Sequence, residues 1–77
     1  MKVIITHNEI QAWENDEQLG KIVFEVSNDK LLILHTYAYQ SGRGIGTLLM
    51  QEATTWAKEQ GYTIVPICTF AKKYLKM

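Results

Sequence analysis

A glycine-rich corner constrains this chain more than any other feature of its sequence. Residues 40–49 read Gln-Ser-Gly-Arg-Gly-Ile-Gly-Thr-Leu-Leu and follow an aliphatic run at 31–34. Gly42, Gly44 and Gly46 let the backbone turn tightly, and the first N–H groups of the helix that follows have no partner within that helix. Such a corner can bind a phosphate or pyrophosphate, or its glycines can serve packing alone.

The helix after this corner predicts a β-α-β crossover. Apolar residues recur at helical spacing along one stripe, namely Ile45, Leu48, Leu49, Ala53, Trp56 and Ala57. Gly61 is placed to end the helix, and residues 62–65 are β-branched or aromatic, as in a strand. Because a strand, a helix and a second strand joined in this way almost always pair in parallel, we expect parallel strands at 31–38 and 62–67.

The remaining segments indicate antiparallel strands and a short helix. Residues 3–5 and 10–13 are apolar clusters on either side of a turn, which fits one or two short strands. Apolar and polar residues alternate at 21–26, as in a half-buried antiparallel strand. The run at 31–34 is apolar on both faces, which predicts a central strand covered on two sides. The segment from Thr69 predicts a short helix whose inward side chains are Phe70, Tyr74 and Met77.

Length and composition limit the classes of protein that the chain can represent. With 77 residues, of which 47% are hydrophobic, it suits one mixed α/β domain over residues 1–77. Eight Lys and Arg balance eight Asp and Glu, so nucleic acid is not an expected partner. A single cysteine and the lack of a membrane span or signal-peptide pattern favour a cytoplasmic location. His7 and the scattered carboxylates lack ligand spacing, so we expect no metal site.

Two common phosphate-binding motifs do not fit the corner. A P-loop requires Lys followed by Ser or Thr after its last glycine, whereas Thr47 follows Gly46 directly. The dinucleotide fingerprint G-x-G-x-x-G requires a glycine at position 47 or 49, where Thr47 and Leu49 stand. The corner is therefore expected to bind a different ligand with a pyrophosphate group.

Three motifs occur in a characteristic order between residues 20 and 77. They are His35-Thr36-Tyr37 at a strand end, Ser41-Gly42-Arg43-Gly44-Ile45-Gly46 at the turn, and Pro66-Ile67-Cys68-Thr69-Phe70 after the last strand. In these motifs the chain resembles the small GNAT-related N-acetyltransferase-like proteins, a minimal branch of the acetyl-CoA-dependent N-acetyltransferase superfamily. The resemblance implies a small GNAT-like fold, in which antiparallel N-terminal strands lead into a β-α-β crossover and a short C-terminal helix.

The resemblance also implies acetyl-CoA as the cofactor. Its pyrophosphate would lie at the helix N-terminus, and the residues implied to bind the cofactor are Tyr37, Ser41, Gly42, Arg43, Gly44, Ile45, Gly46 and Thr47. In the superfamily the pantetheine arm lies between two parallel strands that splay apart. Because Pro66 cannot donate a backbone hydrogen bond, we expect strand pairing to fail near it and to open such a slot.

Cys68 and Tyr74 are the candidate catalytic residues. As a thiolate, Cys68 could accept the acetyl group covalently, although lone cysteines are often buried small hydrophobes. Direct transfer to a neutral amine, in which backbone N–H groups stabilise the oxyanion, needs no cysteine. Tyr74 lies in a segment that resembles the superfamily's Ala-x-x-Tyr helix and could protonate the CoA thiolate or pack as a core aromatic. His35 could orient a substrate or act as a base, but a hydrogen-bonded structural role is more common.

The expected function is transfer of an acetyl group from acetyl-CoA to an unidentified amine. Full-sized superfamily members build the acceptor pocket with an N-terminal helical region, and no such helix is visible before residue 43. A partner chain, including a second copy in a homodimer, could complete the acceptor side. One alternative is a non-catalytic module that binds acyl-CoA or another protein, and a second is a structural domain that uses the corner for packing alone.

Overall fold

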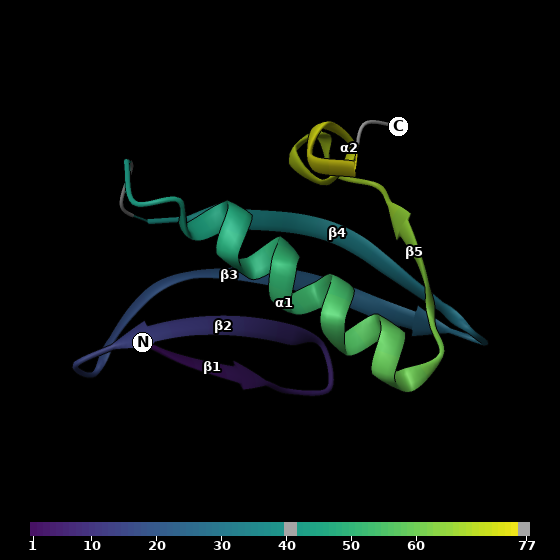
Figure 1. The fold of residues 1–77 in the computed structure, drawn as a ribbon, viewed down its shortest axis with the longest axis horizontal. Coiled ribbons are helices and arrows are strands. Elements are labelled where there is room, and N and C mark those ends of the chain that lie inside the picture. Colours follow the sequence, from purple (N-terminus) through teal and green to yellow (C-terminus); the bar gives the residue numbers. More distant parts are fainter. Residues whose placement is uncertain (40–41, 76–77) are drawn as a thin grey trace.

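The structure, a computed structural model, describes residues 1–39 and 42–75, and in these residues two helices lie on one face of a five-stranded sheet (Figure 1). The strands are β1 (Lys2–Ile5), β2 (Glu9–Glu14), β3 (Glu17–Ser27), β4 (Lys30–Ala38) and β5 (Thr63–Pro66), and the helices are α1 (Ile45–Gln60) and α2 (Thr69–Leu75). The sheet order is β1-β2-β3-β4-β5. Among the strands of the described residues only β4 and β5 pair in parallel, so the predicted mixed α/β class and the β-α-β crossover are confirmed.

Tight hairpins connect the antiparallel strands. Asn15 and Asp16 both have positive φ, which lets a two-residue turn join β2 to β3. The polar stretch around these residues is therefore a hairpin tip, and β3 begins earlier than the alternation at 21–26 indicated. Asn28 also has positive φ and turns the chain from β3 into β4.

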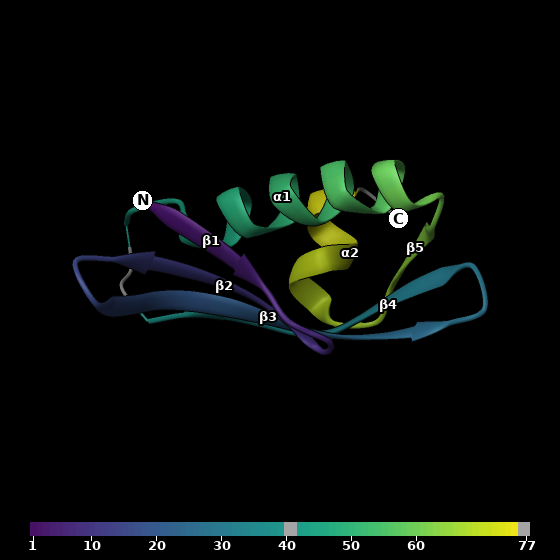
Figure 2. The same cartoon turned by 90° about the horizontal axis from the view of Figure 1, so that it is seen from below.

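The two helices cover one side of β4 only. Leu31 and Ile33 are fully buried, whereas Leu32, which alternates with them, is half-buried. Figure 2 shows both α1 and α2 on the same side of the sheet. The prediction of a strand covered on two faces is therefore wrong, because no helix of residues 1–39 and 42–75 lies on the opposite face.

The core lies between the sheet and α1. Its buried hydrophobic residues are Ile10, Ala12, Leu19, Ile22, Phe24, Leu31, Ile33, Ile45, Leu49, Met50, Ala53, Ala57 and Ala71. The predicted apolar stripe of α1 is confirmed in its main members, with Met50 added and Leu48 only half-buried. In α2 the buried residue is Ala71, whereas the predicted inward Phe70 lies with its ring against Gly46 of α1 but stays 40% exposed and is not part of the core. Met77 lies outside the described residues.

Gly20 lets the start of α1 approach the sheet closely. A Cβ at this buried position of β3 would lie 2.5 Å from the carbonyl oxygen of Tyr37 and 2.8 Å from Cγ2 of Ile45. Neither neighbour can move freely, because one is strand backbone and the other belongs to the first residue of α1. Gly20 therefore fixes the position of the helix start over the end of β4, a role that the sequence did not reveal.

Candidate functional site

The strands β4 and β5 separate after a short pairing. Their last paired residues are Ile33 and Pro66, after which the N–H groups of Ile67 and Cys68 both donate to the Ile33 carbonyl, at 3.0 and 3.1 Å. The chain then leaves the sheet as α2. Within the described part of the chain, the edge of β4 beyond Ile33 pairs with no strand on this side. The predicted failure of pairing near Pro66 is therefore confirmed.

A β-bulge in β4 coincides with this separation. Phe24 of β3 pairs with Ile33 and Val23 pairs with His35, which leaves Leu34 opposite no residue. A bulge bends its strand and increases the local twist. The bulge therefore turns the free edge of β4 immediately after the last contact with β5, and no feature of the sequence pattern marked it.

The glycine-rich corner ends in an open helix N-terminus. Gly42 and Gly44 have φ of 78° and 67°, a left-handed conformation that favours glycine, and nothing lies within 4 Å of where their Cβ atoms would be. Neither a side-chain cap nor an acidic residue is found in the described first turn of α1. Thr47 in that turn is exposed. This arrangement is suited to an anion, because the first backbone N–H groups and the helix dipole favour negative charge.

The third glycine of the corner has a different role. Gly46 is buried in α1, and a Cβ there would lie 2.6 Å from Cζ of Phe70. Gly46 thus lets the first turns of α1 and α2 pack together. Packing, one of the two interpretations of the corner, therefore applies to Gly46, whereas Gly42 and Gly44 shape the turn and leave its surface open. Ser41 lies outside the described residues.

Arg43 forms an ion pair with Glu14 on the β2–β3 hairpin. Its guanidinium Nη2 lies 3.0 Å from Oε1 of Glu14, and the two side chains are 40% and 38% exposed. The corner is therefore tied to a hairpin that precedes it by 29 residues. The sequence predicts Arg43 as a cofactor-binding residue, but its ion pair with Glu14 becomes visible only when the arrangement of the strands is known.

Cys68 caps the N-terminus of α2 at the point where the strands separate. Its Sγ accepts a hydrogen bond from the Ala71 N–H at 3.3 Å and lies 3.3 Å from Oγ1 of Thr36. Its own N–H donates to Ile33. The thiol is partly buried and faces the free segment of β4. The structure thus brings the Pro-Ile-Cys motif together with the His-Thr-Tyr motif.

Residues 3–77 match the model of a protein family described as GCN5-related N-acetyl-transferase. The chain belongs to this family. The match extends the sequence resemblance to β1 and β2, which precede the three motifs. No curated protein matches the chain. The mostly antiparallel sheet and two helices are consistent with a small fold of this family.

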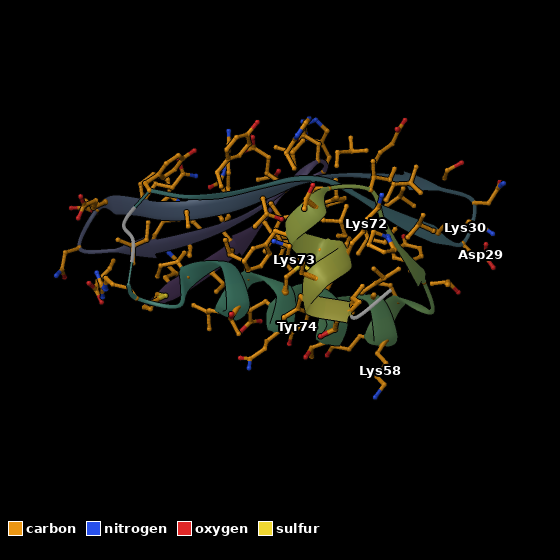
Figure 3. All side chains as sticks on the ribbon, turned by 90° about the horizontal axis from the view of Figure 1, so that it is seen from above. Asp29, Lys30, Lys58, Lys72, Lys73 and Tyr74 are labelled. Atoms are coloured by element: carbon orange, nitrogen blue, oxygen red, sulfur yellow. The ribbon has the colours of Figure 1, made fainter. Side chains whose placement is uncertain are left out.

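The two candidate catalytic residues of this N-acetyltransferase-family chain lie at different ends of α2. Cys68 precedes the helix at the sheet, whereas Tyr74 is six residues later, a rise of about 9 Å along the axis. Figure 3 shows Tyr74 on the part of α2 remote from the sheet. Tyr74 is partly buried against the core. The structure therefore does not group Tyr74 with Cys68.

Tyr37 and His35 lie on the sheet face opposite to Thr36 and Cys68. Thr36 pairs with buried Ile22, and its neighbours in β4 point the other way. The two rings stack with centroids 5.9 Å apart. Tyr37 is 42% exposed. Because it alternates with Thr36 along β4, it does not share a face with the thiol. In residues 1–39 and 42–75 no cluster of three His, Cys, Asp or Glu could hold a metal ion, and no helix is suited to crossing a membrane.

A charged pair on the same open face predicts a pH dependence of stability. Hydrogen bonds from Lys21, at 2.9 Å, and from Gln11, at 2.8 Å, lower the pKa of Glu9. The ionised carboxylate is therefore favoured in the folded state, so its stabilisation is present above the pKa of glutamate in the unfolded chain, about 4.3, and is lost as pH falls through the folded pKa. Urea unfolding from pH 3 to 7 should show Glu9→Gln less stable than wild type at pH 7, with a difference that shrinks as the pH falls toward 3. A difference that is independent of pH would contradict this assignment.

Proposed function

We propose that this GCN5-related N-acetyltransferase-family protein binds acetyl-CoA and transfers the acetyl group to an amine. Family membership supports an acetyltransferase-like function. The observation that carries the finer proposal is the meeting of three features at one end of β4. These are the open N-terminus of α1, the free edge of β4 and the thiol of Cys68.

The first turn of α1 would hold the pyrophosphate. Gly42 and Gly44 add no side chain that would block the approach of a ligand, and Thr47 is exposed beside the N–H groups. A diphosphate accepts hydrogen bonds from such groups and is further favoured by the helix dipole. Arg43 would contribute a guanidinium, which binds phosphate oxygens in a bidentate manner.

The free edge of β4 would hold the pantetheine arm. Beyond Ile33 this edge has backbone groups but no strand partner among the described residues, and the amides of pantetheine can pair with such an edge as a short strand would. An arm that runs along the edge from the start of α1 would carry the thioester toward Thr36 and Cys68, which face each other there.

Cys68 would take the acetyl group by nucleophilic attack. Its thiolate would attack the thioester carbonyl carbon, form an acetyl-cysteine thioester and release CoA as the thiolate. A neutral amine would then attack the carbonyl carbon of the acetyl-cysteine, form the amide and expel the cysteine thiolate as the C–S bond breaks, and the proton lost by the amine nitrogen would pass to solvent. The Ala71 N–H, which already donates to Sγ, lies beside the sulfur at which both bonds would form and break.

A substitution at Thr47 tests the pyrophosphate site with effects of opposite sign. Thr47→Glu places a carboxylate in the first turn of α1 and should raise the free energy of unfolding by about 0.3–1 kcal/mol through the helix dipole. The same carboxylate should weaken CoA binding about tenfold or more, because it occupies the anion site and repels the ligand. Isothermal titration with CoA and urea unfolding measure the two effects.

The matched control is Thr55→Glu, which adds the same charge at an exposed position of α1 about 12 Å further along the axis. It should leave CoA affinity nearly unchanged. Equal losses of affinity in both variants would place the ligand elsewhere. A wild-type protein that gives no heat with acetyl-CoA at millimolar concentration would remove the proposed function.

A non-catalytic acyl-CoA-binding module is the second candidate. It is favoured by the separation of Tyr74 from Cys68 and by the structural use of the thiol as a helix cap. This candidate predicts binding of acetyl-CoA without turnover. Multiple-turnover acetylation of any member of an amine panel would exclude it.

A further inference from the structure

We infer that Glu14 competes with the pyrophosphate of acyl-CoA for Arg43. In this inference, which rests on the proposed function, the carboxylate holds the guanidinium in the unliganded protein and gives it up when the ligand binds. Glu14 would thus set the affinity of the site while lying outside the corner itself, on the β2–β3 hairpin.

The ion pair joins the β2–β3 hairpin to the glycine-rich corner. Glu14 is the last residue of β2, directly before the two-residue turn, and Arg43 lies between the two left-handed glycines that lead into α1. Their contact is 3.0 Å between Nη2 and Oε1. The guanidinium directly before the N-cap of α1 is therefore held by a carboxylate in this structure.

The exposure of the pair makes an exchange of partners inexpensive. Both side chains are well exposed, at 40% and 38%, and exposed ion pairs of this kind contribute little to stability. A guanidinium binds carboxylate and phosphate with the same planar fork. The pyrophosphate carries more negative charge than one carboxylate. It would also accept hydrogen bonds from the first N–H groups of α1, so it would replace Glu14 as the partner of Arg43.

The carboxylate would oppose binding in two ways. It must release the guanidinium, and it remains as a negative charge near the bound diphosphate. Removing the charge of Glu14 without changing its shape should therefore tighten binding. If Glu14 instead positioned Arg43 for the ligand, the same substitution would weaken binding.

Isothermal titration with CoA and with inorganic pyrophosphate tests this inference in wild type, Glu14→Gln, Arg43→Gln and the double variant. At about 50 mM salt, Glu14→Gln should bind both probes about three- to fivefold more tightly than wild type, with a smaller gain at about 200 mM salt. In the Arg43→Gln background, the same substitution should change the affinity less than about twofold.

Glu59→Gln is the control for net charge. Glu59 is exposed near the other end of α1, about 20 Å from the first turn, which exceeds the screening length at physiological salt. This variant should bind CoA as wild type does. An equal gain in Glu59→Gln would show a general charge effect and overturn the inference.

The remaining outcomes separate this inference from the proposed function. Weaker or unchanged CoA binding by Glu14→Gln, with wild type binding CoA, would overturn the competition and leave the proposed function in place. An undiminished gain in the Arg43→Gln background would overturn it as well. Failure of wild type to bind CoA at all would remove the proposed function, and the inference with it.

Discussion

Replacing Gly20 with alanine should lower the free energy of unfolding by about 1–3 kcal/mol, the range found for overpacked cores. The added methyl group would lie 2.5 Å from the Tyr37 carbonyl oxygen and 2.8 Å from Cγ2 of Ile45. Relief requires β3 to move away from β4 or the start of α1 to move away from the sheet. Urea unfolding followed by tryptophan fluorescence measures the loss, since Trp56 contacts the core residue Phe24.

Gly46→Ala is the matched control, because it adds the same methyl group at another buried glycine. Here the nearest atom, at 2.6 Å, is the tip of the Phe70 ring, which is 40% exposed and can turn outward. Alanine also gains about 1 kcal/mol of helix propensity over glycine. We therefore expect little net change in stability. Equal losses in the two variants would show that the close approach at Gly20 has no special importance.

Replacing Cys68 with serine should lower kcat/KM for acetyl transfer by about 10³-fold or more, as the loss of a covalent nucleophile does. Serine is a good N-cap residue, so its hydroxyl can accept the Ala71 N–H that the thiol accepts now. The variant should therefore keep its stability and its affinity for CoA. Steady-state assays of thiol release and mass spectrometry of an acetylated Cys68 in wild type provide the measurements.

Cys68→Ala separates the capping role from the chemical one. It removes both the nucleophile and the cap, so its activity should match that of Cys68→Ser while its free energy of unfolding falls by about 0.5–1 kcal/mol. A Cys68→Ser enzyme with activity close to wild type would instead establish direct attack of the amine on acetyl-CoA.

Much of the fold could be predicted because its determinants are local. The apolar stripe of α1 follows from helical spacing, Gly61 ends the helix in a left-handed conformation, and β5 ends at Pro66. The parallel pairing of β4 and β5 follows from the crossover between them. In each case a few neighbouring residues decide the outcome.

The features that escaped prediction depend on contacts between distant segments. The ion pair of Arg43 with Glu14 requires the β2–β3 hairpin to reach the corner, and the role of Gly20 requires α1 to lie on β3. The segment from Thr69 predicts a short helix with Phe70 inside. The Phe70 ring instead lies against Gly46 of α1 and stays 40% exposed, while Ala71 is the residue of α2 that is buried in the core.

The candidate site could be located from the sequence only in part. The motifs predicted which segments carry it, and the structure places Cys68 beside Thr36 and leaves Tyr37 and Tyr74 apart from them. The cofactor contacts assigned to Gly42, Arg43, Gly44, Ile45, Gly46 and Thr47 stay predictions. The order of the motifs can be read from the sequence, but the direction in which each side chain points depends on strand register and helix capping.

Two hydrogen bonds to the Ile33 carbonyl hold Cys68 in position through main-chain atoms, so this anchor does not depend on which side chain residue 33 carries. One main-chain oxygen fixes both Ile67 and Cys68 to β4. Substitution of Ile33 by another aliphatic residue would change the volume of the core but keep the two hydrogen bonds to its main-chain oxygen. The Cys68 sulfur could thus stay beside Thr36 while mutations change the interior, and stability could vary without displacing the thiol.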